Sequence, residues 1–285
     1  MSLFYVYLSF DHAAKQNWSQ QTPLTNILTS SFENITSSPQ NIMSCTSFNI
    51  TRDHMRDYLS NSDPNKFPHF GTIGAPAGEI FHHVTDQQSL QISLHHQCSS
   101  HHDSACTTPI TSTINDLFPT LFFTSLWTAC LQQNDHPSHN HQCIVTTQDW
   151  IDLYLDTKTK VSNHLFVHNT CCTSSSTTSY SFIDNPPPLL SFEIAPATVP
   201  THVPNNHIQI RKSNGHIRYY LRAIIYYGNF HFTARFIDTQ RHLWAYDSQQ
   251  NNSNPLHEKS SFDTSNLQYL TTLDGRIAHV YVYAI

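Results

Sequence analysis

The last hundred residues alternate apolar and polar positions in a way that predicts β-strands. In "HIQIRKSNGHIRYYLRAIIYY" two strand-like runs are joined by Ser213-Asn214-Gly215, and Asn-Gly is a strong hairpin signal because both turn residues tolerate positive φ. The second run places five apolar residues on one face: Ile217, Tyr219, Leu221, Ala223 and Ile225. Three further strands are expected at "FHFTARFI", "HLWAY" and "AHVYVYAI", and "NPPPLLSFEIAP" fits an edge or isolated strand. We therefore expect a C-terminal antiparallel sheet over 185–285.

The first part of the chain, 1–184, has a mixed helical and irregular pattern. "NITRDHMRDYLSN" predicts a helix that Thr51 caps, and the apolar "MSLFYVYLSF" predicts a buried helix or strand. Pro119 should interrupt any helix through the aromatic segment around it, and the Ser/Thr run "TCCTSSSTTSYS" is typical of a loop. Such a part packed against a sheet gives an α+β fold.

Composition excludes several classes of partner. Only 14 Lys and Arg are scattered over 285 residues and the net charge is −6, so a phosphate-neutralising surface for nucleic acid is not expected. No apolar run reaches the roughly 18 residues of a membrane span, and the N-terminus lacks the basic region of a signal peptide. Seven cysteines without regular spacing favour a reducing, intracellular compartment, cytoplasmic or nuclear.

One histidine and one aspartate are placed as partners in catalysis. If "HFTARFI" and "HLWAY" pair through a turn over 238–241, Asp247 comes beside His231. A carboxylate that accepts the Nδ1 proton of a histidine fixes the ring tautomer and turns Nε2 toward a nucleophile. The alternative interpretation is that both are ordinary polar residues at strand ends.

The segment around this histidine resembles a known family. "YYGNFHFTA" and "LWAYD" resemble the histidine box of the ubiquitin-specific proteases, which are papain-like cysteine peptidases, with Phe232 where that family usually has tyrosine. "AHVYVYAI" is similar to the family's closing strand, and "PPPLLSFEIAP" is similar to its run before the histidine box. The resemblance covers roughly 186–285 and is to divergent versions at the C-termini of large fungal proteins. It implies His231 as general base, Asp247 as its orienting partner, and ubiquitin or a ubiquitin-like protein as partner.

The nucleophile has two candidate positions. The family order is Cys, His, Asp, and no cysteine follows Cys172, which excludes the order with the nucleophile last. Asn169-Thr170-Cys171 copies the family's Asn-x-Cys, but the polar run after it does not suit the helix that activates a thiol. Alternatively the Asn-x-Cys precedes Met1, and "MSLFYVYLSF" is the helix that follows it. On that interpretation 1–285 is a single, incomplete papain-like domain that lacks its cysteine box and does not hydrolyse ubiquitin conjugates.

A degenerate zinc site is a second hypothesis. The family commonly holds zinc between its cysteine and histidine boxes with two Cys-x-x-Cys pairs, and this interval contains Cys98 with His101 and His168 with Cys171. Chance pairs are expected among 21 histidines, and no cofactor is required by the peptidase chemistry.

Three functions are therefore considered. The first is a ubiquitin-specific protease-like domain, inactive as this chain. The second is a module that binds ubiquitin or a ubiquitin-like protein without chemistry, and the third is an unrelated β-rich domain.

Overall fold

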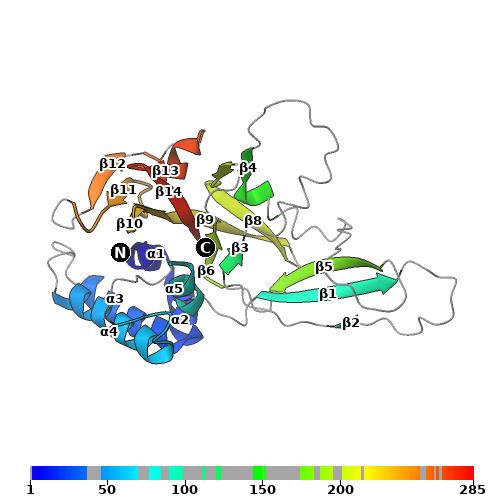
Figure 1. Ribbon diagram of the computed structural model, residues 1–285, viewed down its shortest axis with the longest axis horizontal. Coiled ribbons are helices and arrows are strands. Elements are labelled where there is room, and N and C mark those ends of the chain that lie inside the picture. The colour runs from blue at the N-terminus through cyan, green and yellow to red at the C-terminus, as the bar shows by residue number, and fades with distance from the viewer. Residues whose placement is uncertain are drawn as a thin grey trace.

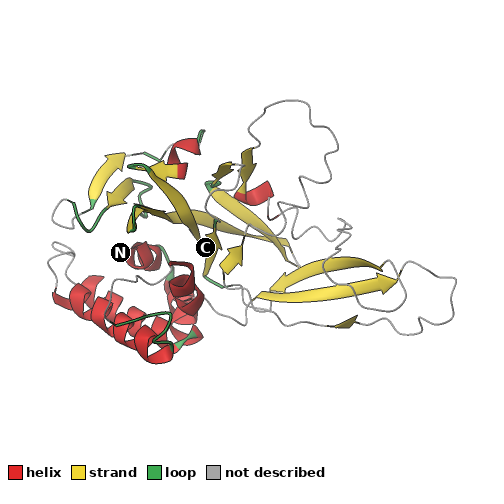
Figure 2. Cartoon of the chain, in the orientation of Figure 1, coloured by secondary structure: helices red, strands yellow, loops and turns green. Residues whose placement is uncertain are grey.

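The computed structural model describes most of the helical part and most of the C-terminal sheet. The described ranges are 2–36, 46–69, 77–84, 90–98, 111–112, 120–122, 144–149, 151, 174–182, 187–194, 201–212, 215–250, 255–259, 261–262 and 265–285. Helices gather on one side of a long, twisted sheet, and a smaller sheet extends away from it (Figures 1 and 2). The expected α+β class, a helical part followed by a C-terminal antiparallel sheet, is confirmed.

Five α-helices form the helical layer within the described ranges: α1 (Ser2–Leu8), α2 (His12–Gln21), α3 (Pro23–Thr36), α4 (Thr46–Ser62) and α5 (Ala77–Val84). Asp11 caps α2 by accepting a hydrogen bond from the Ala14 amide at 2.7 Å. Thr22 and Thr25 cap the start of α3 reciprocally, each hydroxyl accepting from the other's amide. None of these helices is long and apolar enough to cross a membrane.

Two of these helices correspond to sequence predictions. "MSLFYVYLSF" forms α1, which is apolar on nearly all sides because it lies between the sheet and the other helices (Figure 1). The helix predicted around "NITRDHMRDYLSN" exists as α4, but Thr51 does not cap it. That prediction was wrong because α4 already begins at Thr46, and Thr51 is a buried residue inside the helix.

The main sheet has nine strands in the described part of the chain. Along its path the order is β12 (Leu256–Lys259), β11 (Leu243–Tyr246), β10 (His231–Ile237), β9 (Gly215–Gly228), β14 (Arg276–Ala284), β6 (Leu189–Glu193) and β3 (Thr120–Phe122). In addition β8 (His207–Lys212) pairs with β9, and β13 (Thr272–Leu273), which follows the 3-10 helix η3 (Gln268–Thr271), pairs with β14. All these pairings are antiparallel except β3 with β6. The predicted hairpin is confirmed, with Lys212 opposite Gly215.

Two segments differ from the sequence predictions. "LLSFE" was expected at an edge, but β6 pairs with β14 on one side and β3 on the other, because the prolines lie before the strand and leave its own amides intact. The Ser/Thr run was expected to be a loop, but β5 (Ser174–Phe182) pairs along nine residues with β1 (Leu90–Cys98). Threonine suits a pleated strand, and the partner strand satisfies the backbone.

Two small sheets complete the described strands. β1 also pairs with β2 (Thr111–Ser112), and β4 (Ile144–Thr146) pairs in parallel with β7 (Thr201–Val203). The sheet of β1 and β5 lies away from β10 and β11 (Figure 1).

The main sheet separates two hydrophobic cores. One core packs Ile224, Tyr226 and Leu243 of the sheet against η3 through Leu270. The other packs helices α1 to α5 against the opposite face, where Phe236, Val280 and Val282 lie. Tyr5 of α1 stacks on Phe236 with ring centroids 3.8 Å apart, so the helical layer is joined directly to the sheet.

Strand β9 contributes to both cores because its pleat is interrupted. Tyr219 and Leu221 are buried in the first core, as the alternation predicted, but Ala223 is buried in the second. The register with β14 shifts here, since Leu221 pairs with Tyr283 and Ala223 with Val282. The extra residue is Arg222, and a bulge of this kind turns the following side chains to the other face.

Candidate functional site

His231 is placed by a tight turn between β9 and β10. Gly228 pairs with His231, and the two residues between them, Asn229 and Phe230, have φ of 54° and 56°. Two consecutive positive φ values are typical of the two-residue turns that fit strand twist. His231 is therefore the first residue of β10, at one end of the sheet.

Asp247 is placed by the hairpin of β10 and β11. The Asp238 carboxylate organises this turn, because it accepts hydrogen bonds from the backbone amides of Gln240 and His242 and from Nε1 of Trp244. Ala234 then pairs with Tyr246, so Asp247 follows directly after β11, near the end of the sheet at which β10 begins. The structure brings His231 and Asp247 together, as the predicted hairpin implied.

The two side chains form a short, mostly buried contact. His231 Nε2 lies 2.7 Å from Asp247 Oδ1, with side-chain exposures of 14% and 10%. The same oxygen accepts the Gln249 amide at 2.8 Å. Burial alone raises the pKa of Asp247, but the hydrogen bonds from Gln249 and His231 and the charges of His231 and Arg276 outweigh it and lower the pKa below its ordinary value. Asp247 is thus an anion that can orient the ring.

The ring nitrogen that contacts Asp247 differs from the one expected. Nδ1 was predicted to donate to the carboxylate, but Nε2 does so. Asp247 directly follows the neighbouring strand β11, and the ring nitrogen farther from the His231 backbone is the one that reaches it. In the neutral tautomer with its proton on Nε2, Nδ1 carries the lone pair and is the atom that can accept a proton from a nucleophile.

A third charged residue, which sequence reasoning missed, borders this pair. Arg276, at the start of β14, places Nη2 3.9 Å from Asp247 Oδ2, and its side chain is 13% exposed. The strand had been expected to begin at Ala278, and a single arginine 29 positions after Asp247 gives no recognisable spacing signal. Only the order of strands in the sheet brings the two together.

The opposite face of the same strand ends is aromatic. Phe232 and Tyr227 are cross-strand partners with ring centroids 4.7 Å apart, and the His279 ring lies about 6 Å from both. His279 Nε2 is 3.3 Å from Glu193 Oε1. Burial lowers the pKa of His279, although a backbone contact with Ile194 raises it in part, and burial together with Glu79 raises the pKa of Glu193. Both groups are therefore shifted toward their neutral forms.

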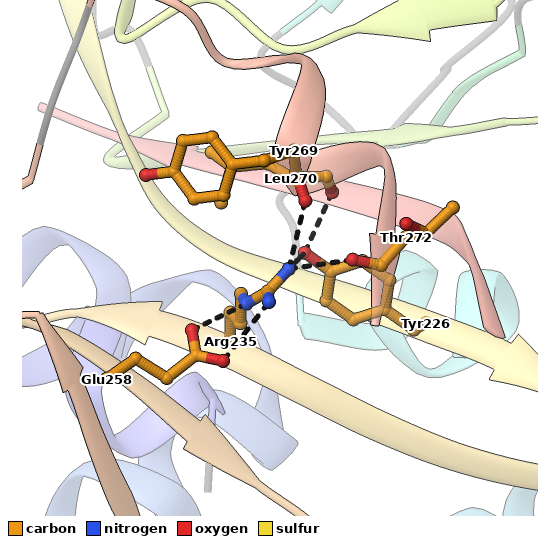
Figure 3. Close-up of polar contacts among 6 residues, drawn as sticks. All are labelled: Tyr226, Arg235, Glu258, Tyr269, Leu270 and Thr272. Carbon is orange, nitrogen blue, oxygen red and sulfur yellow. Dashed lines mark hydrogen bonds and ion pairs between the residues drawn. The ribbon is translucent and has the colours of Figure 1, made fainter. Parts of the chain in front are cut away.

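A separate, mostly buried ion pair joins Arg235 of β10 to Glu258 of β12 (Figure 3). Arg235 binds Glu258 through Nε at 2.7 Å and Nη2 at 3.1 Å, and its Nη1 donates to Tyr226 and to two backbone carbonyls. Because protein groups already occupy the guanidinium of Arg235, we assign it no role in binding or catalysis. We assign this network to stability.

The expected zinc ligands lie almost entirely outside the described residues. His101, His168 and Cys171 are among those not described, and only the backbone of Cys98 is, at the end of β1. Within the described ranges no group of three or more metal-ligating side chains is found. Cys171, the internal candidate nucleophile, is likewise outside them. Neither hypothesis is tested by the geometry.

Comparison with protein-family models and with curated proteins finds no match for this sequence. Among solved structures, the chain is similar to the yeast SAGA deubiquitinating module, with a TM-score of 0.47 and 10% identity over 100% of this chain and 65% of that chain. A SAGA DUB module of Ubp8, Sgf11, Sus1 and Sgf73 bound to monoubiquitin gives a TM-score of 0.48 and 11% identity over 99% and 65%. An essential yeast splicing factor gives 0.41 and 8% over 98% and 65%. The chain therefore spans 65% of the length of each of these three chains.

Proposed function

We propose that this chain is a ubiquitin-specific protease-like domain, in which His231 is the general base and Asp247 orients it. The observation that carries the proposal is the 2.7 Å contact between His231 Nε2 and Asp247 Oδ1, made by the two residues that the histidine-box resemblance singles out. The Nδ1 atom of a histidine held this way can accept a proton from a thiol. The resulting thiolate then attacks the carbonyl carbon of the bond being cleaved.

The proposed partner is ubiquitin or a ubiquitin-like protein, recognised through its C-terminal tail. Tyr227 and Ile277, cross-strand neighbours on the face opposite His231, are 39% and 57% exposed and offer an apolar surface to this partner. Nucleic acid and membrane are not among the proposed partners, and we propose an intracellular location from the cysteine pattern.

We further propose that this chain does not hydrolyse ubiquitin conjugates by itself. The only cysteine in the described ranges, Cys98, lies in the separate sheet of β1 and β5, so the described residues place no thiol beside His231. Without a thiolate no covalent intermediate forms, and histidine and aspartate offer no comparable route to acyl transfer. The second candidate function is a binding module without chemistry.

Two measurements on the purified chain test these statements. The first titrates unlabelled chain into 15N-labelled ubiquitin, where we expect perturbation of the C-terminal tail resonances. A folded sample that perturbs none of them would contradict the proposed partner. His231→Ala is compared with His216→Ala, an exposed histidine at the start of β9 that serves as matched control.

The second measurement is intact mass after incubation with ubiquitin bearing a thiol-reactive C-terminus. We expect no adduct. An adduct that Cys171→Ser removes would make Cys171 the nucleophile and overturn the inactive assignment. Binding without an adduct supports the non-catalytic module, and cleavage of a ubiquitin C-terminal amide that His231→Ala abolishes would contradict it.

A further inference from the structure

Four residues at or directly after the ends of four adjacent strands lie near one another at one end of the sheet. The strand order β11, β10, β9, β14 places Asp247, His231, Gly228 and Arg276 in sequence across it. His231 pairs with Gly228, and Ile277 pairs with Tyr227, so Arg276 lies level with Gly228. The guanidinium therefore approaches Asp247 from two strands beyond the histidine.

Gly228 lies directly beside the Arg276 stem. A Cβ added at Gly228 would lie 3.1 Å from Cγ of Arg276 and 3.3 Å from its Cα, closer than ordinary van der Waals contact. The contact is with the backbone and stem of Arg276 rather than with its flexible end, so a larger residue at 228 would displace the stem. The glycine in "YYGNFHF" thus has a role at this end of the sheet, although its φ is not in the left-handed region.

The two oxygens of Asp247 have different partners. Oδ1 accepts from His231 and Gln249, whereas Oδ2 is buried and has no hydrogen-bond partner, and its nearest cation is Nη2 of Arg276 at 3.9 Å. Nε of Arg276 is also buried without a partner. A buried carboxylate oxygen without a hydrogen bond is costly, and an adjacent opposite charge reduces that cost.

We propose that Arg276 is a positioning residue for the His231–Asp247 pair. Its guanidinium faces Oδ2, which fixes the carboxylate in the orientation that presents Oδ1 to His231 Nε2. The proposal deepens the proposed function, since it matters for catalysis only if the pair is catalytic. The charged or titratable groups that face Asp247 in the described ranges are His231 from β10, Arg276 from β14 and Tyr246 from β11, and Arg52 of α4 acts on Tyr246.

The test observes the pair itself and needs neither ubiquitin nor a thiol. Histidine ring nitrogens are labelled with 15N, and the His231 Nε2 proton is assigned by its loss in His231→Gln. In the unmodified chain we expect this proton to exchange slowly with solvent. Arg276→Gln should accelerate its exchange roughly tenfold or more, because the carboxylate that accepts it is no longer held. The Asp247 carboxyl should also titrate at a higher pH in Arg276→Gln. Arg276→Lys keeps the positive charge, so we expect its Nε2 proton exchange and its Asp247 titration to stay close to those of the unmodified chain.

Arg218→Gln removes an exposed arginine from β9 and serves as matched control, with no change expected. If Arg276→Gln does not fold, Gly228→Ala keeps every charge but displaces the Arg276 stem, and the same accelerated exchange is expected. Exchange and Asp247 titration that match the control in a folded Arg276→Gln protein would overturn the proposal. A failure of ubiquitin to bind would leave this result unaffected, so the two proposals fail separately.

Discussion

At the residue scale, Phe230 combines local strain with near-complete exposure. Its φ is 56° and its side chain is 97% exposed, so the turn beside His231 holds an aromatic residue in the left-handed region without burying it. A side chain with a Cβ costs about 1–2 kcal/mol there, and glycine loses roughly 0.5–1 kcal/mol through its freer unfolded chain. We expect Phe230→Gly to stabilise the protein by about 0.5–1 kcal/mol in urea unfolding.

Phe230→Ala is the matched control for that change, because it removes the ring but keeps the Cβ, and little change is expected. A loss of stability in Phe230→Gly would mean that the ring makes contacts in the folded protein, which contradicts its exposure.

Asp238 makes the stability of the β10–β11 turn depend on pH. Burial alone raises the pKa of Asp238, but hydrogen bonds from Trp244 and His242 outweigh it and lower the pKa below its ordinary value. A carboxylate with a lowered folded pKa stabilises the protein above its unfolded pKa of about 4, and this stability is lost as pH falls through the folded value. We expect Asp238→Asn to cost about 1.5 kcal/mol at pH 7.

The difference in the free energy of unfolding between Asp238→Asn and the unmodified chain should be smaller when urea unfolding is measured below pH 4 than at pH 7. Asp274→Asn, at an exposed turn, is the control and should change little. A deficit that stays constant down to acidic pH would show that the charge of Asp238 does not matter.

The sequence predicted the two site residues that lie in one hairpin, His231 and Asp247. His231 and Asp247 are joined by local strand pairing, which alternation and turn residues reveal. Arg276 belongs to a strand whose place in the sheet depends on long-range pairing, and the choice of Nε2 depends on side-chain reach. Neither the position of Arg276 nor the choice of Nε2 can be predicted from residue spacing.

At the element scale, one arginine links four elements. Arg235 of β10 binds Glu258 of β12 and donates to carbonyls of Tyr269 in η3 and Thr272 in β13 (Figure 3). Its side chain is 11% exposed, so removing it leaves Glu258 as a mostly buried, unpaired charge. We expect Arg235→Met to destabilise the protein by about 3 kcal/mol in urea unfolding.

Removing both charges should cost less than removing one, so Arg235→Met combined with Glu258→Leu should recover part of the loss. Arg52→Met is the control, because its pair with Asp53 is about half exposed on both sides and is expected to contribute little. Equal losses in the single and double variants would argue against an unpaired charge as the cause.

Elements differed in how well their sequence pattern specified them. The strands β8, β10, β11 and β14 followed alternation and turn signals closely. β5 did not, because its strand state depends on a partner, β1, that lies more than 75 residues earlier in the chain. In β9 the alternation was right up to Leu221 and was then reversed by the bulge at Arg222, which is a property of its pairing with β14 rather than of its own sequence.

At the scale of the whole molecule, the helical layer and the sheet share one core. Trp18 of α2 is 1% exposed, packs among α-helical aromatic rings and donates from Nε1 to the carbonyl of Val84 in α5 at 3.0 Å. The same core includes Val280 and Val282 of β14. A loss of packing in the helical layer should therefore also destabilise the sheet, and the two should unfold in one transition.

We expect Trp18→Ala to lower the free energy of unfolding by about 3–5 kcal/mol, the usual cost of removing a large buried aromatic side chain. The decisive measurement is hydrogen exchange of the Val280 and Val282 amides, which lie in the sheet far along the chain from the substitution. Their opening free energies should fall by the same amount as those of α3, because both report one global unfolding event. If the helical amides lose protection while the two valines keep theirs, the helical layer unfolds by itself, and the shared core does not couple the two halves of the fold.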